Sequence, residues 1–161
     1  MIGILIFVIC SNPQELRDLS CRLTQLGASV VCPESQVLTP SMIQSLETLG
    51  PPPRLGLNLV GGRSGLNLAR LLGDGAQFVT FGGMSREPVS FPTSLFIFKD
   101  LNAKGFWLSR WNSQRENLES RRIMLKELLQ MQDAGKLTPR KLENIDIANL
   151  KDNLRNKVLL S

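Results

Sequence analysis

The sequence predicts an α/β fold with a parallel sheet flanked by helices. Short apolar runs rich in β-branched residues alternate with amphipathic runs whose leucines recur at helical spacing. This alternation is the pattern of βαβ units. The chain has 161 residues, 42% of them apolar and 20% charged, which suits one folded domain rather than a disordered segment.

The N-terminal apolar run, Met1 to Cys10, predicts a buried strand from Ile2 to Ile9. Its β-branched residues and its abrupt end favour a strand over a helix. The run is too short to span a bilayer, and it has neither a basic leader nor a small-residue cleavage site. We therefore expect no membrane interaction and no targeting peptide in this chain.

The next segment predicts a helix from Pro13 to Leu26, with signals at both ends. Asn12 is placed to cap the first turn, Pro13 takes the first helical position, and Glu15 lies three residues after the cap. Gly27 follows where a left-handed residue would end the helix.

Apolar spacing, capping residues and glycines predict the remaining elements. They are strands at 28–32, 54–60, 77–81, 104–108 and 158–160, and helices at 40–49, 64–72, 93–101, 116–133 and 147–156. Thr39 is expected to cap helix 40–49, whose inward-facing residues should be Met42, Ile43, Leu46 and Leu49. The apolar stripe of helix 116–133, which predicts core packing, consists of Met124, Leu125, Leu128 and Met131.

The charge distribution, the few cysteines and the absence of histidine limit the kinds of ligand and of functional site that the chain can have. Residues 1–103 carry equal numbers of basic and acidic residues, whereas twelve basic and seven acidic residues follow them. The net charge of +5 fits an anionic ligand or an acidic partner, and it fits equally well a basic surface without a special function. Basic and acidic residues alternate there, which predicts no nucleic-acid binding. Cys10, Cys21 and Cys32 form no Cys-x-x-Cys pair and histidine is absent. We therefore expect no metal site, no His-dependent triad and buried, reduced thiols.

Two strand ends carry motifs that suit a nucleotide cofactor. Gly82-Gly83 follows the strand at 77–81, and two residues without a Cβ let backbone N–H groups approach a ligand. The aromatic pair Phe106-Trp107 lies at the next strand. Taken alone, paired glycines after a strand more often form an ordinary turn than a cofactor site.

Four motifs together are more specific. They are Leu57-Asn-Leu-Val-Gly-Gly62, Val79-Thr-Phe-Gly-Gly-Met84, Leu95-Phe-Ile-Phe-Lys-Asp-Leu101, and Gly105-Phe-Trp-Leu-Ser109 followed by Trp111. In this order and spacing the chain resembles the mitochondrial 2-enoyl thioester reductases, also called enoyl-[acyl-carrier-protein] or trans-2-enoyl-CoA reductases. These form the zinc-free, NADPH-dependent branch of the medium-chain dehydrogenase/reductase superfamily.

The resemblance implies NADPH-dependent reduction of enoyl thioesters of acyl carrier protein or CoA, in mitochondrial fatty acid synthesis. Family members combine a GroES-like domain, which carries a catalytic tyrosine, with a Rossmann domain that holds NADPH. This chain resembles an incomplete Rossmann-like parallel sheet that lacks the first strand-turn-helix unit and the GroES-like domain. We expect residues 1–161 to form a partial NADPH-binding domain, with about 136–161 packing toward the GroES-like domain in full-length relatives.

The resemblance also implies site residues. Contacts to the nicotinamide and its ribose fall on Phe81, Gly82, Gly83, Met84, Phe106, Trp107 and Leu108. Cys10, Ser11 and Asn12 stand where the family clasps the adenosine 2′-phosphate with Arg-Asp-Arg, so we expect weaker NADPH binding. Lys157 matches a lysine that reaches the cofactor, or is a solvated charge at a helix end. No catalytic residue is expected, because the chain contains no tyrosine.

The strand implied to be missing belongs between the strands at 2–9 and 54–60, so each of these should have an unpaired edge. Such edges must pair anew, recruit another chain or lower the stability. A homodimer is one of these outcomes.

A different class of function also remains open, that of a protein-interaction module. Two Leu-x-x-Leu-Leu sequences occur, Leu68 to Leu72 and Leu125 to Leu129, and this motif on an exposed helix can dock in a hydrophobic groove. Both lie on stripes expected to face the core. Exposure of Leu125, Leu128 and Leu129 would favour the docking interpretation.

Overall fold

The computed structural model describes residues 7–10 and 16–137 of the chain. Its contacts separate residues 1–106 from residues 107–161, and each unit is considered by itself. The described part of the first unit contains two parallel sheets, one with two strands and one with three. Helices connect the strands, so the predicted α/β class is confirmed.

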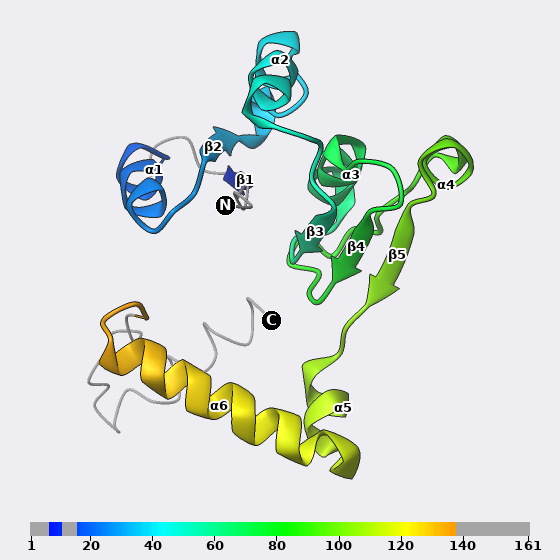
Figure 1. The fold of residues 1–161 in the computed structure, drawn as a ribbon. Coiled ribbons are helices and arrows are strands. Elements are labelled where there is room, and N and C mark those ends of the chain that lie inside the picture. Colours follow the sequence, from blue (N-terminus) through cyan, green and yellow to red (C-terminus); the bar gives the residue numbers. More distant parts are fainter. Residues whose placement is uncertain (1–6, 11–15, 138–161) are drawn as a thin grey trace, which may run out of the picture. The chain divides into compact units, whose positions relative to one another are not determined.

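The larger sheet consists of β3 (Leu55–Asn58), β4 (Gln77–Thr80) and β5 (Asn102–Gly105), with β4 in the middle (Figure 1). Neighbouring strands are parallel, and the register pairs Asn58 with Thr80 and Thr80 with Gly105. The carboxyl ends of the three strands are therefore level at one edge of the sheet. Ligands of open α/β sheets bind outside this edge.

Two connecting helices complete the core of this sheet. α3 (Gly62–Leu71) joins β3 to β4, and α4 (Thr93–Lys99) joins β4 to β5. The buried cluster consists of Ala69, Leu72, Ala76, Phe78, Leu95 and Leu101. Phe78 is only 1% exposed, and its ring meets that of Phe91 edge to face at 5.1 Å. Full burial of such a side chain stabilises the fold by about 1.5–3 kcal/mol.

The smaller sheet pairs β1 (Phe7–Cys10) with β2 (Val30–Pro33), connected by α1 (Leu16–Gln25). The predicted end of this helix is confirmed: Gly27 has φ +103°, and its N–H donates to the Thr24 carbonyl at 3.0 Å. The N–H of Ala28 donates to the Leu23 carbonyl at 2.9 Å. Together these bonds form a Schellman motif. The predicted cap at Asn12 lies outside the described residues.

A short 3-10 turn, η1 (Glu34–Gln36), leads to α2 (Pro40–Leu49). The predicted cap of α2 is confirmed, because the N–H of Met42 donates to Thr39 Oγ1 at 3.4 Å. Its predicted inward face is partly wrong. Leu46 is buried, but Ile43 and Leu49 are 39% and 51% exposed. The spacing identifies the apolar face, whereas the contact that would cover it depends on tertiary packing.

The strand predicted at 104–108 is displaced toward the N-terminus. Asp100 adopts φ +48° and ends α4, and Leu101 enters the core. The chain therefore joins the sheet at Asn102 and leaves it after Gly105. Leu108, predicted as the last strand residue, instead begins a helix.

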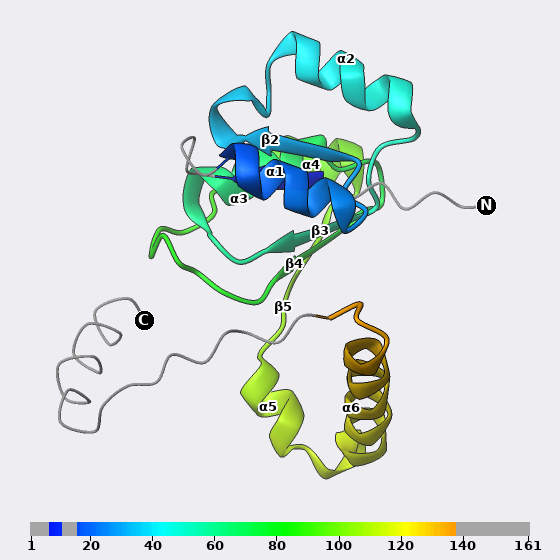
Figure 2. The same cartoon turned by 90° about the vertical axis from the view of Figure 1, so that its left-hand side faces the viewer.

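The described part of the second unit contains α5 (Leu108–Ser113), the 3-10 turn η2 (Arg115–Asn117) and α6 (Leu118–Asp133). Figure 2 shows the two α-helices. The long helix was predicted correctly. The predicted core packing of its stripe is wrong for the part of the chain that the structure describes, where α6 has no buried residue. Amphipathic spacing does not specify which surface covers the apolar face. The elements predicted at 147–156 and 158–160 lie outside the described residues.

The expected open sheet edges are confirmed among the described strands. β1 pairs only with β2, and β3 pairs only with β4. Each of these two strands therefore has one edge without a strand partner in the described part of the chain.

Candidate cofactor-binding site

The carboxyl edge of the larger sheet is fixed by one buried amide. The Asn58 side chain is 3% exposed; its Nδ2 donates to Thr80 Oγ1 at 3.1 Å, and its Oδ1 accepts from the N–H of Gly61 at 3.0 Å. Asn58 therefore joins the ends of β3 and β4 and shapes the turn that enters α3. The sequence interpretation did not single it out. An Asn at a strand end, three residues before a Gly-Gly turn, is the signal that was available.

The Gly61-Gly62 turn at the start of α3 is required by the packing of the chain itself. Gly61 and Gly62 have φ of +91° and +51°. A Cβ on Gly61 would lie 2.9 Å from the Glu87 carbonyl, and one on Gly62 would lie 2.6 Å from Glu87 Oε2. The Gly62 N–H already donates to the Glu87 carbonyl at 3.0 Å. This helix start is thus covered by the loop after β4 and does not form an open phosphate cradle.

The loop after β4 is hydrogen-bonded to the residues that come directly after β3. The N–H groups of Met84 and Ser85 donate to the carbonyls of Leu59 and Val60 at 3.0 and 2.8 Å. These bonds hold the C-terminal end of the segment that contains Gly82 and Gly83. The N–H of Phe81 donates to the Asn58 carbonyl at 3.0 Å and holds its N-terminal end. The predicted residues Phe81 to Met84 are therefore brought together at the carboxyl edge.

Gly82 and Gly83 differ in what they contact. A Cβ on Gly82 would overlap Leu59 Cδ1, whereas one on Gly83 would meet nothing within 4 Å. Gly83 also lacks a positive φ, so nothing in the described residues requires glycine there. The backbone N–H groups of both glycines have no hydrogen-bond partner in the part of the chain that the structure describes. This arrangement offers two adjacent donors, with open space at Gly83.

Aromatic and thioether side chains border these donors in the first unit. Phe81 and Met84 are 47% and 72% exposed. Phe106 follows β5, and its N–H donates to the Thr80 carbonyl at 2.9 Å, which keeps it at the same edge. An apolar surface with a few free donors is the usual composition of a small-molecule site.

Trp107 and Leu108 belong to the second unit, so they are described by themselves. Both are exposed, and Leu108 is the first residue of α5. The Arg110 guanidinium carbon lies 5.3 Å from the centroid of the Trp107 ring, within the range of a cation–π interaction. Of the remaining predicted site residues, Cys10 ends β1. Ser11, Asn12 and Lys157 lie outside the described residues.

The cysteines differ in exposure. Cys32 is fully buried, its Sγ donates to the Pro33 carbonyl at 3.2 Å, and burial raises the pKa of its thiol. Cys21 is exposed, so the prediction of a buried thiol is wrong at that position.

Within residues 7–10 and 16–137 no cluster of three or more Cys, Asp or Glu side chains could hold a metal ion. No helix described there has the length and apolar character needed to cross a membrane.

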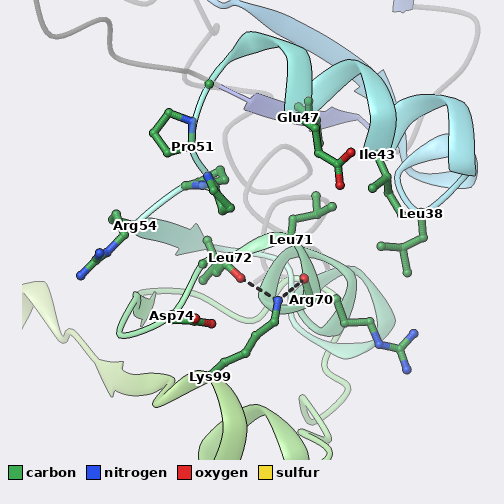
Figure 3. Close-up of a pocket in the computed structure, with 15 residues that line it drawn as sticks. Leu38, Ile43, Glu47, Pro51, Arg54, Arg70, Leu71, Leu72, Asp74 and Lys99 are labelled. Carbon is green, nitrogen blue, oxygen red and sulfur yellow. Dashed lines mark hydrogen bonds between the residues drawn. The ribbon is translucent and has the colours of Figure 1, made fainter.

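A cavity of about 960 Å³ opens at the other end of the sheet, toward the residues that precede the strands (Figure 3). Leu46 of α2, the prolines before β3 and Leu72 supply apolar walls. Lys99 Nζ donates there to the carbonyls of Arg70 and Leu72 at 3.0 and 2.8 Å. No predicted cofactor residue lines this cavity. Its lysine closes the C-terminal end of α3.

The two Leu-x-x-Leu-Leu sequences have different surroundings. In the first, Ala69 and Leu72 are buried in the core, so that copy is not presented as a docking motif. In the second, Leu125, Leu128 and Leu129 are 51%, 38% and 60% exposed. The exposure of these three leucines is the observation that would favour the docking interpretation for the second copy.

Comparisons with known proteins identify the relatives of this chain. No protein-family model matches it. The mitochondrial enoyl-[acyl-carrier-protein] reductase of Dictyostelium discoideum is 41% identical over 121 residues, which make up 75% of this chain and 34% of that protein. An Etr1p variant solved in complex with NADP and crotonyl-CoA has a TM-score of 0.81 and 27% identity, over 96% of this chain and 45% of that one. The mitochondrial 2-enoyl thioester reductase Etr1p/Etr2p heterodimer from Candida tropicalis has a TM-score of 0.77 and 28% identity, over 92% and 45%.

The chain thus spans about a third of the length of the curated relative and less than half of the solved structures. The comparison with curated sequences and the comparison with solved structures both find members of the family that the four motifs predicted. The predicted resemblance is confirmed: the chain is a relative of the mitochondrial 2-enoyl thioester reductases, matched over only part of their length.

Proposed function

We propose that this chain supplies the nicotinamide-facing part of an NADPH site in a mitochondrial enoyl thioester reductase. The observation that carries the proposal is the pair of unpartnered backbone N–H groups at Gly82 and Gly83, at the carboxyl edge of a parallel sheet. A carboxamide or ribose oxygen can accept from such donors. The solved relative in complex with NADP and crotonyl-CoA supports the choice of ligand.

The described residues fit the nicotinamide end of this cofactor. Phe81 and Met84 provide apolar contact surface, and the open space over Gly83 allows a ring to approach the backbone. NADPH supplies a hydride when it is bound. The protein groups described here would bind and orient the nicotinamide, and Asn58 would hold the loop that carries them.

A two-dimensional NMR titration with NADPH tests this site, because it detects weak binding. We expect saturable shifts of the Gly82, Gly83 and Met84 amides. Gly83→Ala should keep the melting temperature, since its Cβ meets no atom, and should weaken binding about tenfold by blocking the approach of the ligand, a loss of about 1.4 kcal/mol. Gln44→Ala on α2 is the control and should bind normally. Absence of saturable shifts, or equal binding by Gly83→Ala, would contradict the proposal.

We also propose that these 161 residues alone do not reduce enoyl thioesters. The chain has no tyrosine, the residue to which the family resemblance assigns a catalytic role. Purified chain with NADPH and crotonyl-CoA should show no turnover above the uncatalysed rate. Robust turnover would show that the required groups are present.

The proposed location is mitochondrial, by resemblance to the relatives, and fractionation of cells that express the native gene would check it.

The exposed leucines of α6 favour a second candidate, in which the helix docks in a groove of another protein. Leu125 and Leu129 are one helical turn apart and both more than half exposed. The double variant Leu125→Glu with Leu129→Glu should release any partner that co-purifies in a fixed ratio with the native chain. Leu118→Glu, on the same helix but outside the motif, should retain it. Equal retention by both variants would exclude the docking role.

A further inference from the structure

Leu59 is the residue around which the loop after β4 closes. The N–H of Phe81 donates to the Asn58 carbonyl at 3.0 Å, and the N–H of Met84 donates to the Leu59 carbonyl at 3.0 Å. The pair Gly82-Gly83 lies between these two bonds. The backbone on both sides of the glycine pair is therefore tied to two consecutive residues at the end of β3.

The Leu59 side chain occupies the side of Gly82 on which a Cβ would project. That Cβ would overlap Leu59 Cδ1, and it would lie 3.1 Å from the Leu59 carbonyl oxygen and 3.3 Å from Leu59 Cγ. The three nearest atoms thus all belong to this leucine. A Cβ on Gly83 would meet nothing within 4 Å. Leu59 therefore packs against Gly82, whereas the space at Gly83 is open.

A glycine pair needs such a support if its N–H groups are to keep one direction. Glycine has more backbone freedom than any other residue, and the N–H groups of Gly82 and Gly83 have no hydrogen-bond partner among the described residues. Rotation of the peptide between them would turn the Gly83 N–H away from a ligand. Donors bind best when the protein holds them in the binding orientation beforehand. The contact with Leu59 restricts this rotation.

We propose that Leu59 is a positioning residue of the nicotinamide-facing site: its side chain fixes the backbone of Gly82 and so aims the N–H groups of the glycine pair at the ligand. The identity of that ligand rests on the proposed function. Leu59 is 42% exposed and lies outside the buried cluster of the larger sheet, so the core does not require leucine there. Gly82 has no positive φ, so it is the contact with Leu59 that requires glycine at this position.

Backbone order parameters from ¹⁵N relaxation test the positioning step without any ligand. For Gly82 and Gly83 we expect values of about 0.85 in the native chain and below about 0.6 in Leu59→Ala, with a melting temperature lowered by only a few degrees. Leu59→Met has a similar volume and should keep the native values. Leu55→Ala makes the same truncation at a 56% exposed leucine at the other end of β3 and should also keep them. Unchanged order parameters in folded Leu59→Ala would overturn the inference.

Titration of the same variants with NADPH separates this inference from the proposed function. Leu59→Ala should raise the dissociation constant about tenfold, whereas Leu59→Met and Leu55→Ala should bind like the native chain. Equal affinities of the native chain and Leu59→Ala would overturn the role of Leu59. Absence of saturable binding by the native chain would instead contradict the proposed function, and the order parameters would still decide whether Leu59 positions the loop.

A double variant keeps the contact testable if truncation of Leu59 alone perturbs folding. Gly82→Ala should lower the melting temperature, because its Cβ overlaps Leu59 Cδ1. Leu59→Ala combined with Gly82→Ala removes the overlapping atom, so the double variant should melt at a higher temperature than Gly82→Ala alone. A double variant that melts no higher than Gly82→Ala would overturn the contact and the positioning role with it.

Discussion

Asn58 Nδ2 donates to Thr80 Oγ1 at 3.1 Å and so joins the last residues of two neighbouring strands. The same amide accepts from the Gly61 N–H, and its side chain is almost fully buried. One residue thereby fixes both the edge of the sheet and the turn into α3. The loop that carries Gly82 and Gly83 depends on this arrangement, because it hydrogen-bonds to the residues that follow Asn58.

Removal of this amide should lower the stability of the fold. Asn58→Ala leaves the Gly61 N–H without its acceptor, and a buried unsatisfied group costs about 1–3 kcal/mol. We expect the free energy of unfolding in urea to fall by that amount. Asn112→Ala, at an exposed position of α5, should change it by less than about 0.5 kcal/mol. Equal effects of the two substitutions would refute the role assigned to Asn58.

Two glycines of the same region should respond differently to a methyl group. Gly61→Ala puts a Cβ 2.9 Å from the Glu87 carbonyl at φ +91°, so we expect a loss of about 1–3 kcal/mol from strain and displacement of the loop. Gly83→Ala has open space and should stay within about 0.5 kcal/mol of the native chain. Thermal and urea unfolding of both variants provide the comparison. A large loss in Gly83→Ala would mean that this glycine serves the fold.

The thiol of Cys32 should make stability depend on alkaline pH. Burial raises its pKa in the folded state, so its contribution is complete below the ordinary thiol pKa of about 8.5 and is lost as the pH rises toward the folded-state value. We expect unfolding in urea to become easier as the pH rises above the ordinary thiol pKa of about 8.5, and less steeply so in Cys32→Ala. In native buffer, mass spectrometry after alkylation should find Cys21 modified and Cys32 protected. Rapid modification of folded Cys32 would contradict its burial.

Lys99 should stabilise the C-terminal end of α3. Its ammonium donates to the carbonyls of Arg70 and Leu72, and a cation at this end also interacts favourably with the helix dipole. Lys99→Met removes both bonds but keeps an unbranched side chain, so we expect a loss of about 1–2 kcal/mol in unfolding free energy. Lys126→Met on the exposed surface of α6 is the control. No difference between the two variants would show that these bonds contribute nothing measurable.

Local signals account for the part of the fold that was predicted from sequence. The caps at Thr39 and Gly27 act within one helical turn, so they can be recognised without knowledge of tertiary contacts. Phe81 to Met84 were assigned through the family resemblance, and the short connection from β4 places them at the carboxyl edge. The displaced start of β5 escaped prediction because the left-handed turn at Asp100 occurs on a residue other than glycine.

By itself the sequence determined the order of strands and helices, their main caps and the family, because these depend on residue spacing along the chain. Only the tertiary structure showed that Asn58 bridges two strand ends, that Glu87 covers the start of α3, and that Gly83 faces open space. It also decided which apolar stripes are covered, since Leu46 is buried whereas Leu125 is exposed. The physical reason is that periodicity specifies a face of an element, while burial and free hydrogen-bond donors depend on what another segment places against that face.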